Sequence, residues 1–279
     1  MLSQIGGSDW WVYLLTFLVG VGAGILSALL GVGGAVVTTP AIRVLGATPI
    51  LAVGSTVPAI LPAAISGTWR YAKAGLVDWR AALGLGISGA VFAIGGAMTS
   101  SLIDGRVLML LTALLMFWSG ISVVRGGRGS GQPEPGREPG TELDTEPDAE
   151  PHTEPKHSLP LIGSLGAVSG FVAGLLGVGG GIIMVPVLTG PLKIPMKSAV
   201  ASSLVAVAIF SIPALITHII LGHVDWAFAL PLMLGVIPGA QIGARITIGS
   251  SDRSIRLLFG ALIIVLALVY GISEALAFF

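Results

Sequence analysis

The chain of 279 residues contains no cysteine, and only 10% of its residues are charged. Without thiols it has no disulfide framework, no thiolate metal site and no cysteine nucleophile. Typical soluble domains carry about 25% charged residues, so the composition excludes a soluble globular enzyme. Fourteen basic residues balance fourteen acidic ones, which leaves no basic surface of the kind that nucleic acid requires.

Sequence motifs of several enzyme classes are also absent. The chain has no HExxH zinc motif, no GxSxG nucleophile elbow and no GxxxxGK[ST] phosphate-binding loop. The apolar segments carry hardly any ionisable side chains, which argues against a pump or cation carrier that works through carboxylates. We therefore predict that the protein is not an enzyme and needs no cofactor or metal.

Apolar residues and glycine dominate the composition. Hydrophobic residues make up 54% of the chain, which also holds 41 glycines, and the mean hydropathy is +0.94. Glycine is more frequent in membrane helices than in soluble ones, and about 20 apolar residues span the hydrocarbon. The sequence therefore predicts an all-α polytopic protein within the lipid bilayer. Eight long apolar segments qualify, at residues 10–30, 50–69, 81–101, 107–124, 159–176, 198–221, 227–249 and 257–278.

One stretch, residues 126–157, differs sharply from the rest. It holds eight acidic residues, three basic ones and six prolines, five of them in Glu-Pro pairs. Proline and charge together prevent a packed core, so we expect an acidic, extended linker. The linker separates a first membrane repeat, residues 10–125, from a second one, residues 158–279.

The two repeats share one pattern of residues. Gly31-Val32-Gly33-Gly34 matches Gly177-Val178-Gly179-Gly180 at an offset of 146, and the same offset relates Pro40 to Pro186. A Gly-x-Val-Asp-Trp motif that ends at Trp79 matches one that ends at Trp226, at an offset of 147. The order and spacing indicate an internal duplication, which is the usual construction of secondary transporters.

A short apolar piece follows each glycine cluster, at residues 35–45 and 182–190. Each is too short to cross a bilayer and too apolar for a solvated loop. We expect two short helices, with Pro40 and Pro186 inside them as structural helix breaks. Each proline removes one helical hydrogen bond and leaves a carbonyl free.

Two topologies are compatible with these segments. If all eight long segments cross, the fourteen Lys and Arg residues divide seven to seven between the two faces. In the second topology, the first long segment and the short piece of each repeat form a re-entrant hairpin. The basic residues then divide twelve to two between the faces, or ten to two without the linker residues Arg137 and Lys156. The positive-inside rule favours the second arrangement. We therefore predict inverted repeats, each of one glycine-broken hairpin and three crossings, with a cytoplasmic linker and both termini outside.

The glycine clusters are candidate anion sites. A glycine elbow frees backbone amides, and the first amides of the helix that follows lack partners and lie at the positive end of its dipole. Irregular backbone is tolerated at membrane depth only against protein or a wet cavity. Nearby hydroxyl groups can line a polar path or bond to their own helix. The candidate substrate-binding residues are Gly31, Gly33, Gly34, Ala35, Thr38, Thr39, Ser55, Thr56, Gly177, Gly179, Gly180, Gly181, Ser202 and Ser203.

Three polar residues within the apolar segments are candidates for gating or proton relay. His218 either relays protons or packs as a neutral side chain. Gln241 and Arg245 share a helical face at i and i+4, and Arg245 either faces a cavity or reaches the cytoplasmic interface.

The duplicated GVGG, the proline six residues later and the Gly-x-Val-Asp-Trp motif resemble the TauE/SafE family of sulfite or sulfonate exporters. The resemblance covers roughly residues 12–124 and 160–275. It implies an inner-membrane permease for small organic or inorganic sulfur anions. The first repeat departs slightly from the second, with Ala35 at the place of Gly181.

These observations lead to one main hypothesis and two rivals. The main hypothesis is an exporter of a small oxyanion, such as sulfite or an organosulfonate, that works by alternating access. A rival within transport is a proton-coupled carrier of another small solute. A rival from another class is a membrane scaffold subunit that transports nothing. The oligomeric state is left open by the sequence.

Overall fold

The computed structural model describes residues 10–45, 49–100, 103, 105–126, 159–176 and 180–276. All regular structure in this part of the chain is α-helical, as predicted. The described helices are α1 (Trp10–Leu30), α2 (Ala35–Val44), α3 (Pro49–Lys73), α4 (Trp79–Ser100), α5 (Gly105–Gly126), α6 (Leu159–Leu176), α7 (Gly181–Thr189), α8 (Met196–Ile220), α9 (Trp226–Gly249) and α10 (Asp252–Leu276).

Six of the described helices are long and apolar enough to cross a membrane: α1, α3, α4, α6, α8 and α9. In α5 the apolar stretch is shorter, Leu110–Arg125. Large apolar side chains such as those of Leu14, Phe92 and Leu234 point outward from the bundle. Such a surface is suited to hydrocarbon, so the chain is an integral membrane protein. Of the eight expected long segments, those of α5 and α10 stay predictions as membrane crossings.

The two halves of the chain interlock through helix pairs. Helix α1 packs most extensively against α9 of the other half, and α6 packs in the same way against α4. A Cβ atom at Gly24 would lie 2.8 Å from the Cα atom of Val236, and one at Gly170 would overlap the backbone of Gly89. Only glycine lets these backbones approach so closely, which is a common device of membrane helix packing.

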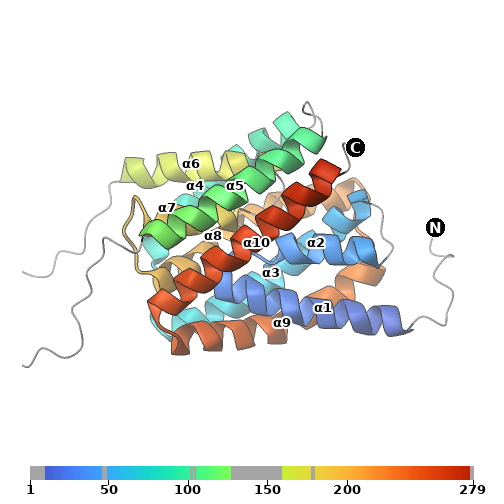
Figure 1. Ribbon diagram of the computed structural model, residues 1–279, viewed down its shortest axis with the longest axis horizontal. Helices are drawn as coiled ribbons and strands as arrows, with labels where there is room; N and C mark the ends of the chain where they lie inside the picture. The colour runs from blue at the N-terminus through green and yellow to red at the C-terminus, as the bar shows by residue number, and fades with distance from the viewer. Residues whose placement is uncertain are drawn as a thin grey trace, which may run out of the picture.

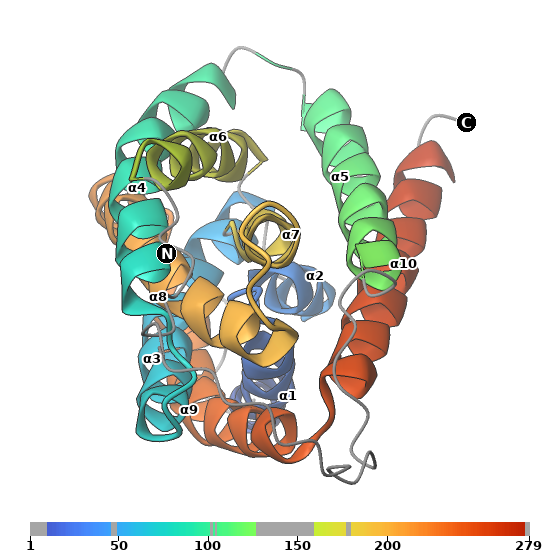
Figure 2. The ribbon, with the colours of Figure 1, turned by 90° about the vertical axis from the view of Figure 1, so that its left-hand side faces the viewer.

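The two short helices lie in the middle of the bundle. Viewed end-on, α2 and α7 are surrounded by the long helices (Figure 2). Helix α7 packs against α8 and α5, and α2 packs against α3. Every α7 residue from Gly181 to Pro186 is buried, as is Leu188. The short apolar pieces are therefore core elements, which explains why they lack the polar face of a surface helix.

The described helices that flank the linker and those nearest the termini mark two ends of the bundle. The first turn of α1 and the last turn of α10 lie at one end, and the last turn of α5 and the first turn of α6 lie at the other (Figure 1). Helix α2 runs back toward the end at which α1 begins, and α7 runs back in the same way along α6 (Figure 1). Helix α1 has 21 residues and α2 has 10, so α2 is only about half as long as α1, which measures about 32 Å.

Candidate functional site

Left-handed glycines form the turn between α1 and α2, which we call the first elbow (residues 31–34). Gly31, Gly33 and Gly34 have φ angles of 69°, 85° and 76°. Gly180, directly before α7, has a φ of 72° and occupies the position equivalent to Gly34. L-residues with a side chain rarely adopt these angles, so the repeated glycines are needed for the backbone itself. Gly177 and Gly179, from the cluster before α7, lie outside the described residues.

Gly180 and Gly181 at the start of α7, which we call the second elbow, are buried, and Gly181 lies against the first elbow. A Cβ atom at Gly181 would overlap the carbonyl oxygen of Gly31 and the Cα atom of Val32. The hydroxyl of Ser203 donates to the same Gly31 carbonyl at 3.0 Å and to the Val200 carbonyl at 2.8 Å. All four residues of the first elbow are buried, so the contact is enclosed by protein.

Both short helices follow a glycine, Gly34 or Gly180, which has no side chain that could cap the first amides. The first bonded amides of α2 are those of Val37 and Thr38, which donate to the Gly34 carbonyl at 3.0 and 3.1 Å. In α7 the amides of Ile183 and Met184 donate to the Gly180 carbonyl, both at 3.1 Å, and Gly180 supplies no side-chain cap. The amides one and two residues earlier therefore come before the first helical bond and lie at the positive helix end.

The threonines near the first elbow connect α2 to α3. Thr38 donates its hydroxyl to the Gly34 carbonyl at 3.3 Å. The hydroxyls of Thr39 and Thr56 are 3.3 Å apart, and Thr56 donates to the carbonyl of Val53 at 2.8 Å. These groups, together with Ser203, are the candidate hydroxyls that the fold brings to the elbow region.

Ser55 and Ser202 form hydrogen bonds between the two halves of the chain. Each accepts a backbone amide from the loop of the opposite half: Asp78 donates to Ser202 at 2.9 Å, and Asp225 donates to Ser55 at 2.8 Å. The two aspartates in turn cap α4 and α9, through the amides of Ala81 and Ala227 at 2.9 Å. The two serines thus hold each half of the chain to the other.

Pro186 lies inside α7, and its effect on the helix is visible. Because proline has no amide hydrogen, the Ile182 carbonyl one turn earlier has no helical donor. Ser119 of α5 donates its hydroxyl to that carbonyl at 2.6 Å. The freed carbonyl therefore attaches α7 to α5. Pro40 lies within α2 at the equivalent position.

Two buried serines were missed by the sequence analysis. The hydroxyls of Ser27 and Ser169 are buried and have no hydrogen-bond partner among the described residues. The Ser27 hydroxyl lies 3.7 Å from where a Cβ atom at Gly34 would be, so it lies next to the start of α2. Its position four residues before Gly31, on the same face of α1, is the only signal that points to it.

The three candidates for gating or proton relay lie apart from one another. Gln241 donates from Nε2 to the carbonyl and hydroxyl of Ser66, both at 2.9 Å, and accepts from Arg70 at 3.5 Å. Arg245 is exposed on the outside of the bundle. His218 contacts the ring of His223 at the end of α8. None of these described contacts reaches the elbows.

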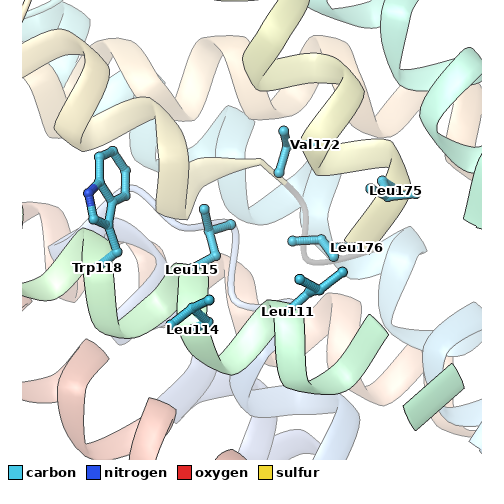
Figure 3. A pocket seen from close by; sticks show the side chains of 7 residues that line it. All are labelled: Leu111, Leu114, Leu115, Trp118, Val172, Leu175 and Leu176. Carbon is cyan, nitrogen blue, oxygen red and sulfur yellow. The ribbon is translucent and has the colours of Figure 1, made fainter. Parts of the chain in front are cut away.

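A groove of about 430 Å³ separates α5 from α6 (Figure 3). Its walls are almost entirely apolar, made by Leu111, Leu114, Leu115, Trp118, Val172, Leu175 and Leu176. An ion would lose its hydration there without any compensating contact, so this groove is not an anion site. Among the described residues, no three His, Asp or Glu side chains gather as metal ligands.

Comparison with known proteins agrees with the membrane architecture. The family model described as "Sulfite exporter TauE/SafE" matches residues 16–270. A probable membrane transporter protein of Bacillus subtilis, YunE, is 28% identical over 91% of this chain and 95% of its own length. One from Xylella fastidiosa is 29% identical over 88% and 89% of the two chains. One from Methanocaldococcus jannaschii is 26% identical over 91% and 93%. No solved structure matches the chain.

The family match extends from within α1 into α10. It therefore includes both elbows, the short helices and the helix pairs that join the two halves. The relatives span nearly the whole chain, and all three are named as probable membrane transporters. The six apolar helices agree with that role. The chain therefore belongs to the TauE/SafE family of membrane transporters.

Proposed function

We propose that the chain exports a small anion, sulfite or an organosulfonate, and that the anion binds where the two elbows meet. One observation carries the proposal: Gly181, at the start of α7, lies against Gly31 and Val32 of the first elbow in the buried centre. The uncapped start of α7 is thereby brought against the turn that leads into α2. Helix starts of this kind bind anions without a charged side chain.

Hydroxyl groups complete the proposed site. The Ser27 hydroxyl is buried beside Gly34 and has no partner within the described residues. A hydroxyl in that state has a free donor for an oxyanion, since burying it unpaired costs about 1–3 kcal/mol. Sulfite and sulfonates carry three oxygens on one sulfur, which suits several donors that converge from two sides. The negative C-terminal end of α1 reduces the positive potential at the start of the short helix. It leaves the amide donors there in place.

The proposed topology is a pair of inverted repeats, residues 10–125 and 158–279. Each has a re-entrant hairpin, α1–α2 or α6–α7, and three crossings, α3–α5 or α8–α10. The twelve-to-two division of basic residues supports this arrangement. So does the return of each short helix toward the end at which its hairpin begins (Figure 1). The linker is then cytoplasmic, both termini lie outside, and the protein resides in the inner membrane.

The packing of helices between the two halves supports alternating access. Helices α1, α2, α3 and α9 form one group of mutual contacts, and α4, α6, α7 and α8 form the other. The groups meet along α3 and α8 and at the elbows. Rocking about the α3–α8 contact opens the elbow site to one face at a time. Export of an anion from a negative interior is downhill by about 2.3 kcal/mol per charge per 100 mV, so no fuel-binding site is needed.

The direct test is efflux of sulfite and of an organosulfonate from proteoliposomes, with and without an imposed potential. We expect efflux that grows with an inside-negative potential and that falls severalfold in Ser27→Ala. Thr16→Val is the matched control, because Thr16 is a buried α1 hydroxyl that donates only to the carbonyl of Val12 in its own helix. A scaffold would show no efflux at all. Efflux that follows an imposed pH gradient and ignores the potential would indicate the proton-coupled carrier.

The topology is tested by cysteine labelling from outside, in a chain that has no native cysteine. The hairpin arrangement predicts that neither Ser130→Cys nor Ser254→Cys is labelled in intact cells. Labelling of Ser254→Cys alone would instead support eight full crossings.

A further inference from the structure

Helix α8 ends in a turn that forces two side chains together. Gly222 has a φ of 68°. Its amide donates to the carbonyl of Ile219 at 3.1 Å, and the His223 amide donates to the carbonyl of His218 at 3.0 Å. This pattern of two bonds is the Schellman motif, in which the side chains at the two ends of the longer bond touch. Here both side chains are imidazoles, with ring centroids 5.6 Å apart and planes inclined at 59°.

The equivalent turn at the end of α3 has the same geometry with other side chains in place of the two histidines. Gly75 has a φ of 67°, and the amide of Leu76 donates to the Tyr71 carbonyl at 3.1 Å. The paired side chains are there Tyr71 and Leu76, which both pack into the hydrophobic core. A contact between largely apolar groups is what normally accompanies the motif. Ending the helix therefore does not require histidine, and the second half carries it at both positions.

The histidine pair has the features of a metal chelate. Both rings are half-buried, and Nδ1 of His218 is buried with no hydrogen-bond partner in the described part of the chain. Neutral imidazole is the commonest protein ligand for Zn²⁺ and Cu²⁺, and the negative end of a helix favours a cation. We propose that His218 and His223 bind one divalent transition-metal ion, such as Zn²⁺ or Cu²⁺.

Water molecules would complete the coordination of this ion. Within the described residues no third His, Asp or Glu joins the pair. A metal site with open positions exchanges its ion more readily than the closed four-ligand sites that serve a structural purpose. The site is thus one for reversible metal binding at the loop between α8 and α9, independent of the elbow site.

The experiment uses the purified full-length chain with an affinity tag that contains no histidine. The chain has four histidines, and His152 and His157 lie in the linker, so His152→Ala/His157→Ala serves as the reference protein. Zn²⁺ binding is measured by calorimetry at neutral pH, and Cu²⁺ ligation by electron paramagnetic resonance. We expect the reference protein to bind one Zn²⁺, and its Cu²⁺ spectrum to show nitrogen ligands.

Two variants made in the reference protein locate the site. His218→Tyr/His223→Leu copies the Tyr71 and Leu76 pair of the first half, so the turn is preserved, and we expect it to lose the bound ion. His223→Gln alone should weaken Zn²⁺ binding at least tenfold. This single variant tests the site if the double variant does not fold. Absent binding in the reference protein, or unchanged binding in a folded variant, would overturn the proposal.

Discussion

Replacing Gly181 by alanine places a methyl group in the contact between the two elbows. Its Cβ atom would overlap the Gly31 carbonyl oxygen and the Val32 Cα atom, and would lie 2.8 Å from the Val32 carbonyl carbon. Ordinary Cβ contacts begin at 3.4 Å, and all three obstacles are backbone atoms that cannot rotate away. One elbow must therefore withdraw by roughly half an ångström or more.

The expected cost follows from these contacts. Overpacking a filled site costs about 1–3 kcal/mol, and the better helix propensity of alanine returns up to about 1 kcal/mol. We expect Gly181→Ala to lose about 2 kcal/mol, which lowers the melting temperature by about 4–8 °C. Because the displaced amides are the proposed anion donors, sulfite efflux from proteoliposomes should fall at least tenfold.

The repeat provides a matched control for this substitution. The first half carries Ala35 at the position equivalent to Gly181, so Ala35→Gly removes a methyl group where the other variant adds one. Ala35→Gly keeps the backbone amide that is the proposed donor, so it should cost at most about 1 kcal/mol of helix propensity and leave efflux close to wild type. Wild-type stability and efflux in Gly181→Ala, or an equal loss in Ala35→Gly, would refute the elbow contact as the cause.

Three further predictions concern the packing that supports the site, each measured by thermal unfolding in detergent. Ser202→Ala leaves the Asp78 amide without its acceptor and should cost about 1–2 kcal/mol; no loss would mean that the bond between the halves is not a stabilising one. Tyr71→Phe removes a buried 2.7 Å hydrogen bond to an α1 carbonyl and should cost about 1 kcal/mol, and a stabilised variant would contradict this. Gly170→Ala forces α6 away from α4 and should cost about 3 kcal/mol, whereas Gly163→Ala on the same helix meets no neighbour and should cost nothing; equal effects would refute the close approach.

Local features of the fold were predictable because they depend on short stretches of sequence. The segment at residues 10–30 was expected as one helix and forms α1. The two short helices begin within one residue of their expected starts, since glycines that require positive φ precede both. The Asp-Trp motif of the second half caps α9, because the Asp225 side chain accepts the Ala227 amide.

The partners of the polar side chains were not predictable, because they depend on how distant helices pair. Ser55 and Ser202 were placed among the substrate-binding candidates, yet each holds a loop of the opposite half. Gln241 was considered together with Arg245, its neighbour on the same helix face. The pairing of α9 with α3 instead gives Gln241 Ser66 and Arg70 as partners. A single sequence does not reveal these contacts between helices of opposite halves.

Ser27 shows a different limit of sequence reasoning. Hydroxyl residues are common in apolar helices, and most of those described here donate to a carbonyl of their own helix, as Thr16 and Thr247 do. What distinguishes Ser27 is the absence of such a bond within the described residues and its position beside Gly34. Both facts depend on the turn of the first elbow, which brings α2 back against α1.

The central claim, that the anion is held by backbone amides at the elbows, is tested most directly by nuclear magnetic resonance. Labelling glycine with carbonyl ¹³C and isoleucine with ¹⁵N selects five amides, those of Ile25, Ile87, Ile121, Ile182 and Ile272. Only Ile182 is the second residue of a short helix, and the other four lie inside long helices. Titration with sulfite should shift the Ile182 signal in a saturable way and leave the other four in place. An Ile182 signal that stays fixed at saturating sulfite would contradict the account.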